Sequence, residues 1–157
     1  FFLTWKAREF GMHTRFIELA GEINSSMPSY VVNQTANALN TLGKPLKNSK
    51  ILILGLSYKK NIDDLRESPS LDIIELLIRK EANINYCDPF FNSLPKTRKF
   101  NFPLKGINLT KENLTKADAV ILATDHDAFD YELIKRFSNL IIDTRGRFKP
   151  SDNIIRG

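Results

Sequence analysis

The chain has 157 residues, a net charge of +5, 42% hydrophobic and 26% charged residues, which is ordinary for one globular domain plus an appendage. Its Lys and Arg residues form no run of about five or six, which argues against nucleic-acid binding, and no apolar run approaches the roughly 20 residues of a membrane span. The single cysteine, Cys87, excludes an internal disulfide and suits a reducing compartment, so we expect a cytoplasmic location.

The first part of the chain has a helical pattern. Its start lacks the basic region of a signal peptide, so none is expected. It also begins without Met, so we expect a fragment of a longer protein. Residues 1–10 favour a short helix ended by Gly11, and a longer helical segment begins near Thr14. Pro28 predicts a kink or a fresh start there, because proline is disfavoured inside a helix. Beyond it, one helical face carries Val31, Thr35, Ala38 and Leu42.

From residue 50 onward, short apolar runs alternate with amphipathic segments. Such a pattern predicts a parallel sheet covered by helices, here a three-layer Rossmann-like α/β fold preceded by a long, kinked helical region. We therefore expect two parts, a helical region over 1–48 and an α/β domain over 49–157. The predicted strands are 51–54, 84–87, 119–124 and 140–143, with a weak fifth near 107–109, and the predicted helices are 70–81, 111–116 and 129–137.

Dense charge follows the first predicted strand. The cluster comprises Lys59, Lys60, Asp63, Asp64, Arg66 and Glu67. Ligands of open α/β sheets bind beyond the carboxyl ends of the strands, and Lys and Arg suit a phosphorylated ligand. The alternative is that these charges pair among themselves on a solvated loop. No G-x-G-x-x-G follows Gly55, so a standard NAD site is not expected within this chain. Ser68 and Pro69 predict a conventional helix start.

The later strands also end in polar residues. Asp88 is placed either to hold a ribose or to form an Asp-Pro turn, and Cys87 is expected to be a buried, inert thiol. His126, between two aspartates, suits a ligand contact at the edge of a site, or a helix cap or hydrogen bond across the sheet end. A metal site is not expected, because the other histidine, His13, is far away in sequence.

Arg145 and Arg147 follow the last predicted strand and suit either a phosphate or carboxylate ligand or surface ion pairs. Strands one, three and four thus all end in polar or charged clusters. The carboxyl ends of parallel strands lie along one edge of a sheet, where independent surface salt bridges would not be expected to collect. The repetition therefore favours a phosphate-binding edge.

Several motifs in order carry a family resemblance. Residues 55–60 (Gly-Leu-Ser-Tyr-Lys-Lys) and 63–69 (Asp-Asp-Leu-Arg-Glu-Ser-Pro) resemble the signature that opens the C-terminal UDP-sugar-binding domain of the UDP-glucose/GDP-mannose dehydrogenase family. Residues 124–126 and 143–145 fall in the family's order and spacing. Residues 1–7, 15–20 and 27–32 resemble its central helical region. Their sequence is most similar to the branch that oxidises UDP-N-acetylhexosamines, notably UDP-N-acetylglucosamine 6-dehydrogenases.

The resemblance implies an NAD-dependent oxidation of a sugar C6 alcohol to a carboxylate in two steps, for polysaccharide biosynthesis. It also implies a homodimer formed through the central helix. The NAD domain and the catalytic Cys of the family would lie upstream, so this chain would hold no catalytic residue and would be inactive alone. By position, Tyr58, which replaces a frequent Phe, and Lys59 would contact the UDP part of the substrate. Arg145 would hold its phosphate, and Arg66 would reach toward NAD.

The resemblance assigns no definite role to His126, which stays a possible residue at the edge of the site. A different class of function is also open on the sequence alone. A flavodoxin-like regulatory domain without enzymatic activity would use the same charged edge to bind a nucleotide or a protein.

Overall fold

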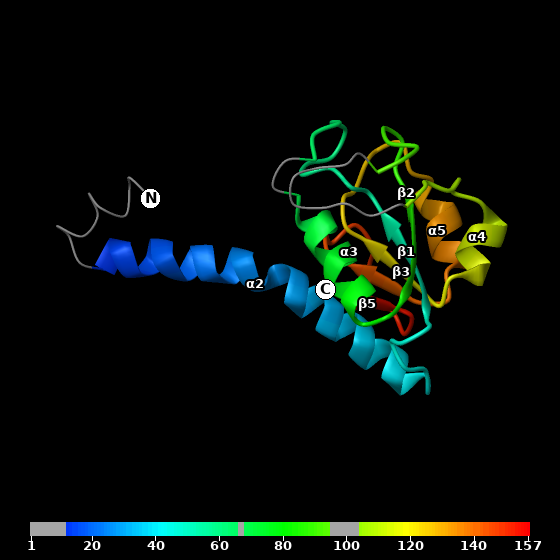
Figure 1. Cartoon of the computed structure of the whole chain (residues 1–157), viewed down its shortest axis with the longest axis horizontal. Coiled ribbons are helices and arrows are strands. Elements are labelled where there is room, and N and C mark those ends of the chain that lie inside the picture. The colour runs from blue at the N-terminus through cyan, green and yellow to red at the C-terminus, as the bar shows by residue number, and fades with distance from the viewer. Residues whose placement is uncertain (1–11, 66–67, 95–103) are drawn as a thin grey trace.

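The computed structural model describes residues 12–65, 68–94 and 104–157, with side chains described from residue 26 onward. A long helix precedes five strands and three shorter helices (Figure 1). The elements are α2 (Met12–Thr41), β1 (Lys50–Leu54), α3 (Pro69–Arg79), β2 (Asn83–Cys87), α4 (Lys111–Lys116), β3 (Ala119–Leu122), α5 (Tyr131–Phe137), β4 (Ile141–Asp143) and β5 (Ile154–Arg156). The predicted helix over 1–10 lies outside the described residues.

All five strands are parallel, in the order β2-β1-β3-β4-β5. Their register aligns their carboxyl ends, because Leu54 pairs with both Cys87 and Leu122, and Asp143 pairs with Leu122 and Arg156. The loops that follow β1, β2, β3 and β4 therefore leave the sheet at one level. This edge is where the sequence predicted a site.

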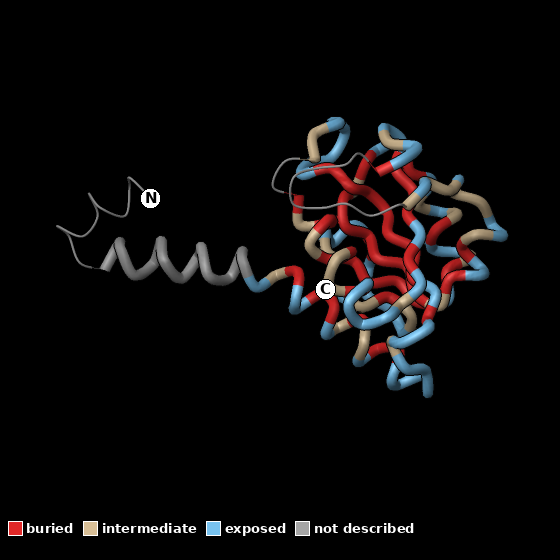
Figure 2. Tube along the Cα trace, in the orientation of Figure 1, coloured by how far each residue is buried: buried red, intermediate tan, exposed pale blue. Residues whose placement is uncertain are grey.

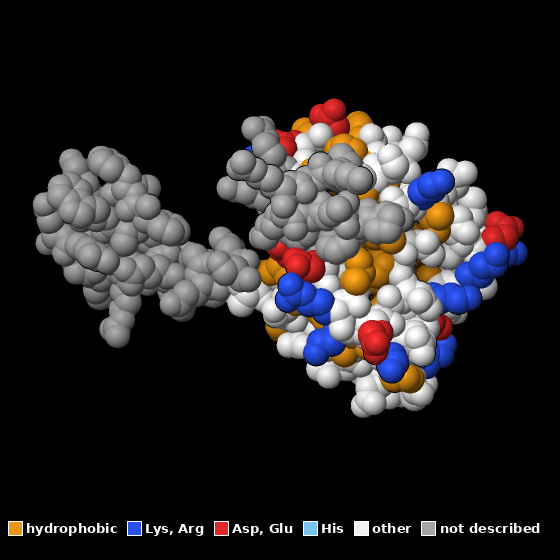
Figure 3. Space-filling view, in the orientation of Figure 1, with side chains coloured by type: hydrophobic (Ala, Val, Ile, Leu, Met, Phe, Trp, Pro, Cys, Tyr) orange, Lys and Arg blue, Asp and Glu red, His pale blue; other side chains and the backbone are white. Residues whose placement is uncertain are grey.

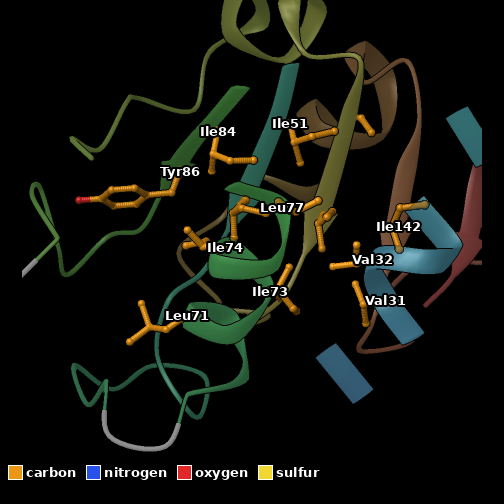
Figure 4. Close-up of a cluster of buried hydrophobic side chains, with 14 of the residues drawn as sticks. Val31, Val32, Ile51, Leu71, Ile73, Ile74, Leu77, Ile84, Tyr86 and Ile142 are labelled. Atoms are coloured by element: carbon orange, nitrogen blue, oxygen red, sulfur yellow. The ribbon is translucent and has the colours of Figure 1, made fainter. Parts of the chain in front are cut away.

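Helices cover both faces of the sheet, which confirms the predicted three-layer α/β fold. Side chains alternate along β1, so Ile51 and Ile53 pack under α2 and α3, whereas Leu52 and Leu54 pack under α4 and α5. The strands form the buried centre in Figure 2, and Figure 4 shows α3 side chains meeting those of the sheet. The first cluster is completed by residues such as Leu39, Ile74, Leu77, Ile121 and Ile142, and the second by Leu114, Val120, Phe129 and Ile134.

Pro28 lies inside α2 and does not end it, so the predicted fresh start is wrong, while Figure 1 shows that the helix changes direction near its middle. Val31, Thr35 and Ala38 are buried as their spacing predicted. Leu42 is 55% exposed instead. It follows the last residue of α2, where Gly43 turns the chain with a φ of +73°. In its place Leu39, three residues earlier on the helix, is fully buried.

Two further expectations about strands are corrected. Residues 107–109 form no strand, because only the Ile107 N–H, which donates to the Tyr86 carbonyl, and a bridge at Gly106 connect this segment to β2. The sheet gains its fifth strand from β5 beside β4, which the sequence did not predict. The strand predicted over 119–124 ends at Leu122, since the Ala123 and Thr124 N–H groups both donate to the Leu54 carbonyl.

Ser68 caps α3 with Pro69 in its first turn, as predicted. Within the part of the chain that the structure describes, no helix combines the length and hydrophobicity needed to cross a bilayer. On the face shown in Figure 3, Lys and Arg side chains are interspersed with Asp and Glu.

Candidate phosphate-binding edge of the sheet

The site begins at Gly55, which follows β1 directly. Its φ of +89° favours glycine, and a Cβ there would lie 2.5 Å from both Cβ and the carbonyl oxygen of Thr124. The Gly55 N–H donates to the Cys87 carbonyl at 3.0 Å. Glycine at this position therefore lets the ends of β1, β2 and β3 approach one another closely.

The residues after Gly55 are fixed by hydrogen bonds to the neighbouring strand ends. The Leu56 N–H donates to Oδ2 of Asp88 at 2.7 Å, and Thr124 Oγ1 donates to the Ser57 carbonyl at 2.6 Å. The Tyr58 N–H donates across the loop to the Asp64 carbonyl at 2.9 Å. Hydrogen bonds to the neighbouring strand ends thus hold the start of the loop in place.

Tyr58 and Lys59 lie on the outer part of this loop. Tyr58 is 45% exposed, and Lys59 is also exposed, with its Nζ 5.8 Å from the centre of the Tyr58 ring. Lys59 forms no ion pair with any carboxylate of residues 26–65, 68–94 or 104–157, the ranges whose side chains the structure describes. Its ammonium group is therefore available to an anionic ligand.

Arg145 reaches the same loop from the end of β4. Its Nε donates to the Ala123 carbonyl at 2.9 Å, and Nη2 lies 3.4 Å from the Tyr58 carbonyl. Its own N–H donates to Asp143, whose carboxylate shapes the turn. Arg145 is exposed and, within the described ranges, pairs with no carboxylate. The structure thus brings the predicted residues Tyr58 and Arg145 together across 87 positions of sequence.

The neighbouring cations, Lys60 and Arg147, behave differently. Arg147 lies 3.6 Å from Asp125 and 3.5 Å from Asp127, and its guanidinium stacks 4.3 Å from the Tyr131 ring centre. Lys60 lies 4.0 Å from Asp127. A hydrogen bond from the Asn61 amide, followed by the charge of Lys60, lowers the pKa of the Asp127 carboxyl. Among the described residues, Lys60 and Arg147 thus have acidic partners, whereas their near neighbours Lys59 and Arg145 do not.

His126 is fully buried beneath the loop, where it hydrogen-bonds across the sheet end. Its Nε2 lies 3.1 Å from Oδ2 of Asp88 and 3.5 Å from Ser57 Oγ, and its Nδ1 accepts the Asn61 N–H at 2.7 Å. The rings of Phe90 and Phe129 contact its edges. His126 thus has no open path to a ligand in this structure, and its contacts match the second of the two predicted roles.

Asp88 forms the turn that its Asp-Pro sequence predicted. Its Oδ1 accepts the Phe90 N–H at 2.8 Å, while Oδ2 accepts the Leu56 N–H. The carboxylate is buried, so both oxygens serve the protein rather than a ribose.

Asn61 is a site residue that the sequence analysis did not single out. It adopts a left-handed φ of +63°, and its amide exchanges two hydrogen bonds of 2.8 Å with the side chain and N–H of Asp127. Asparagine tolerates this backbone region better than most residues. In the sequence, an Asn within a charged loop could have indicated a residue with a left-handed backbone at this position.

Residues 52–150 match the model of the UDP-glucose/GDP-mannose dehydrogenase family, UDP binding domain. The chain belongs to this family. It is 35% identical over 125 residues to the UDP-N-acetyl-D-mannosamine dehydrogenase of Methanococcus maripaludis strain C7, covering 80% of this chain and 27% of that protein. It is 33% identical to the NDP-N-acetyl-D-galactosaminuronic acid dehydrogenase of Ralstonia nicotianae, over 84% of this chain and 30% of that protein.

Among solved structures, the UDP-D-ManNAc dehydrogenase of Pyrococcus horikoshii resembles the chain with a TM-score of 0.70 and 28% identity, over 90% of this chain and 32% of that one. The chain thus spans about a third or less of these relatives. The resemblance read from the sequence is confirmed at the level of the family and of its UDP-binding domain.

The residues after β1 do not form the pyrophosphate cradle of a dinucleotide site, although the family resemblance implies NAD. The N–H groups of Gly55 and Leu56, which would face a pyrophosphate, already donate to Cys87 and Asp88. Arg66, the residue expected to reach toward NAD, lies outside the described residues. In the described part of the chain, no three His, Cys, Asp or Glu side chains gather as metal ligands.

Cys87 has the buried environment that was predicted for it. Burial and then the charge of Asp88 raise the pKa of its thiol to about 11. Such a thiol is almost entirely protonated at neutral pH and is a poor nucleophile.

Proposed function

We propose that the chain supplies the UDP-binding domain of an NAD-dependent UDP-sugar 6-dehydrogenase, which oxidises the C6 alcohol to a carboxylate in two steps. The observation that carries this proposal is the pair formed by Lys59 and Arg145. Both are exposed cations at the carboxyl edge of the sheet, without acidic partners in the described residues. The diphosphate of a UDP-sugar carries about two negative charges and suits such a pair.

The two cations suit different parts of the ligand. Lys59 offers a point charge on a flexible stem, whereas Arg145 offers a planar fork already oriented by its bond to the Ala123 carbonyl. The exposed ring of Tyr58 lies beside Lys59, where it can face the uridine. We therefore assign substrate binding to Tyr58, Lys59 and Arg145. Arg66 would contact NAD held by another domain.

The substrate that we propose is a UDP-N-acetylhexosamine. The names of two relatives, a UDP-N-acetyl-D-mannosamine dehydrogenase and an NDP-N-acetyl-D-galactosaminuronic acid dehydrogenase, support this class of sugar. The sequence of residues 1–32 favours UDP-N-acetylglucosamine within this class. A panel of the three N-acetylhexosamine isomers and UDP-glucose, tested with the full-length enzyme, would decide among them.

The remaining parts of the reaction would come from outside this chain. The high pKa of the Cys87 thiol argues against a nucleophilic role, so we propose that the catalytic Cys and the NAD domain lie upstream and that the chain alone is inactive. We assign residues 1–48 to the central helical region, with homodimerisation through α2. Closing the two nucleotide-binding domains over the substrate would exclude water during hydride transfer.

Calorimetric titration of the chain with UDP at low salt tests the site. We expect Lys59→Ala to raise the Kd for UDP about tenfold or more, because it removes a charged hydrogen-bond donor. Lys60→Ala is the matched control and should change the Kd by less than about twofold, since Lys60 already faces Asp127. Arg145→Lys and Arg147→Lys form a second matched pair with the same expected order.

An absence of heat with millimolar UDP, or equal effects of the two lysine substitutions, would contradict the site assignment. That result would favour the regulatory, flavodoxin-like alternative, in which the same edge binds another nucleotide or a protein. Turnover by the unmodified 157-residue chain with NAD and a UDP-sugar would contradict the proposal that catalysis needs upstream residues.

A further inference from the structure

We propose that His126, Asp88 and Asn61 are positioning residues that hold the Lys59 loop in the conformation needed to bind a diphosphate. The inference rests on the proposed function of Lys59, and it assigns a role to a buried histidine whose motif the family resemblance left without one. None of the three is a catalytic residue, because each acts on the ligand only through the backbone that carries Lys59.

The hydrogen bonds around His126 fix its tautomer. The Asn61 N–H can only donate, so Nδ1 at 2.7 Å must be the acceptor and carries no proton. The ring proton therefore lies on Nε2, which donates to Oδ2 of Asp88 at 3.1 Å. The imidazole thus connects a backbone donor on one side with a carboxylate on the other, and both nitrogens are used.

The same carboxylate oxygen connects the two arms of the loop. Oδ2 of Asp88 also accepts the Leu56 N–H at 2.7 Å, immediately after β1. Asp88 thereby holds the arm that precedes Lys59, and through His126 it holds Asn61, two residues after Lys59. Lys59 is therefore carried by a short span of chain whose two ends are tied to a single buried group.

Asn61 completes the restraint at the surface. Its left-handed backbone directs its N–H inward to His126, while its side chain exchanges two hydrogen bonds with Asp127. Asp127 follows His126 in sequence, so both contacts of Asn61 lead to the segment after β3. These hydrogen bonds thus fix the position of the loop after β1 relative to the segment after β3, and Arg145 contacts both of them.

A purely structural role would have a different signature. The network lies at one end of the sheet, where it orients the loop after β1 and, through the bond from the Phe90 N–H to Asp88, the turn after β2. A fully satisfied buried polar network rigidifies the residues that it joins. Loss of the network should therefore loosen the loop and weaken ligand binding while leaving the centre of the sheet intact.

The test uses the 157-residue chain, UDP as the probe, and backbone amide hydrogen exchange as the local readout. His126→Ala should raise the Kd for UDP about tenfold and accelerate exchange at the Asn61 amide at least about tenfold. Exchange at Ile53, in the interior strand β1, should change by less than about twofold. His126→Asn, which keeps an acceptor near the position of Nδ1, should recover part of both losses.

Tyr131→Phe is the matched control, because it removes the hydrogen bond from the Tyr131 hydroxyl to the His126 carbonyl at 2.6 Å but leaves the ring network intact. It should change neither the Kd nor Asn61 exchange by more than about twofold. If His126→Ala fails to fold, His126→Asn becomes the decisive variant. Unchanged UDP binding in a folded variant, or equal acceleration at Asn61 and Ile53, would overturn the positioning role.

A chain that binds no UDP at all would contradict the proposed function, and the positioning role would then be decided by hydrogen exchange alone. Faster exchange confined to the loop would still support it, whereas an unchanged Asn61 amide would refute it. The ¹⁵N chemical shifts of the imidazole give a further check, since a protonated Nδ1 would contradict the network directly.

Discussion

The two ends of the sheet both carry ion pairs, but they differ in the basic residues that stay without an acidic partner. At the amino end, Asp118 accepts hydrogen bonds from the Lys44 ammonium at 2.9 Å and from the Lys50 N–H at 2.8 Å, and Lys47 lies 3.2 Å from Glu81. At the carboxyl end, Lys59 and Arg145 have no acidic partner among the described residues. The amino-end pairs join the segment between α2 and β1 to the residues just before β3 and just after α3. Lys59 and Arg145, without such partners in the described residues, are open to a ligand.

The backbone differs between the two ends as well. Gly43 and Gly55 both have positive φ, but a Cβ on Gly43 would meet nothing within 4 Å, whereas one on Gly55 would collide with Thr124. The amino-end turn is open, and the carboxyl-end loop is packed against its neighbours. A tightly held loop is what a site with fixed cations requires.

The largest expected effect comes from Gly55→Ala. The added Cβ meets backbone and side-chain atoms of Thr124 at 2.5 Å, and the positive φ adds strain, so we expect a loss of about 3 kcal/mol of unfolding free energy. Gly43→Ala, the matched control, should lose only about 1 kcal/mol, from its positive φ alone. Urea unfolding measures both. Equal losses would mean that the carboxyl-end loop is no more tightly packed than the amino-end turn.

A second prediction concerns Cys87 at the end of β2. Because its pKa is raised from 9.0 to about 11, its thiolate population at pH 8 falls about 100-fold, and burial slows access further. Alkylation by iodoacetamide in the folded chain should therefore be at least about 100-fold slower than in the same chain unfolded in urea. A fast reaction would show that this part of the carboxyl end opens readily to solvent.

A third prediction tests the amino end through pH. Partial burial acts to raise the pKa of Asp118, but the hydrogen bonds from Lys50 and Lys44 and their charges outweigh it and lower the pKa below 3.8. The carboxylate therefore contributes stability above pH 3.8, and this contribution is lost as the pH falls through the folded-state pKa. Asp118→Asn should cost about 1 kcal/mol at pH 7.

The effect of Asp118→Asn should shrink as the pH falls below the folded-state pKa, because the wild-type carboxyl is then protonated as well. Urea unfolding at a series of pH values measures this convergence. If the difference in unfolding free energy between wild type and Asp118→Asn stayed constant across the series, the charge of the Asp118 carboxylate would not be the source of its contribution to stability.

The sequence predicted the fold well because its main determinants are local. Continuous apolar runs such as 51–54 and 119–122 specify buried parallel strands, and Ser68 with Pro69 specifies the start of α3. The strand β5 was not predicted, because a segment of three residues is too short to show an alternating or continuous apolar pattern. It is defined as a strand by its pairing with β4. The placement of the site followed from topology, since parallel strands end at one edge.

Contacts over long sequence distances could not be predicted in the same way. The network of His126 joins Asp88, 38 residues earlier, to Asn61, 65 residues earlier, and no local pattern connects them. Likewise, Lys59 and Lys60 are identical neighbours in the sequence. Only the position of Asp127 in space distinguishes the paired lysine from the free one.

The smallest expected effects come from the exposed ion pairs, one at each end. Lys47 and Glu81 are about two-thirds exposed, and such pairs contribute little in water, so Lys47→Ala should change the unfolding free energy by about 0.5 kcal/mol or less. Lys60→Ala should leave the urea midpoint unchanged, because the Lys60–Asp127 pair is longer, at 4.0 Å, and also exposed. A clear loss with Lys60→Ala alone would mean that charge, rather than the hydrogen bonds of Asn61 and His126, holds the carboxyl-end loop. It would also remove Lys60→Ala as a neutral control for Lys59, since loosening the loop would then weaken UDP binding indirectly.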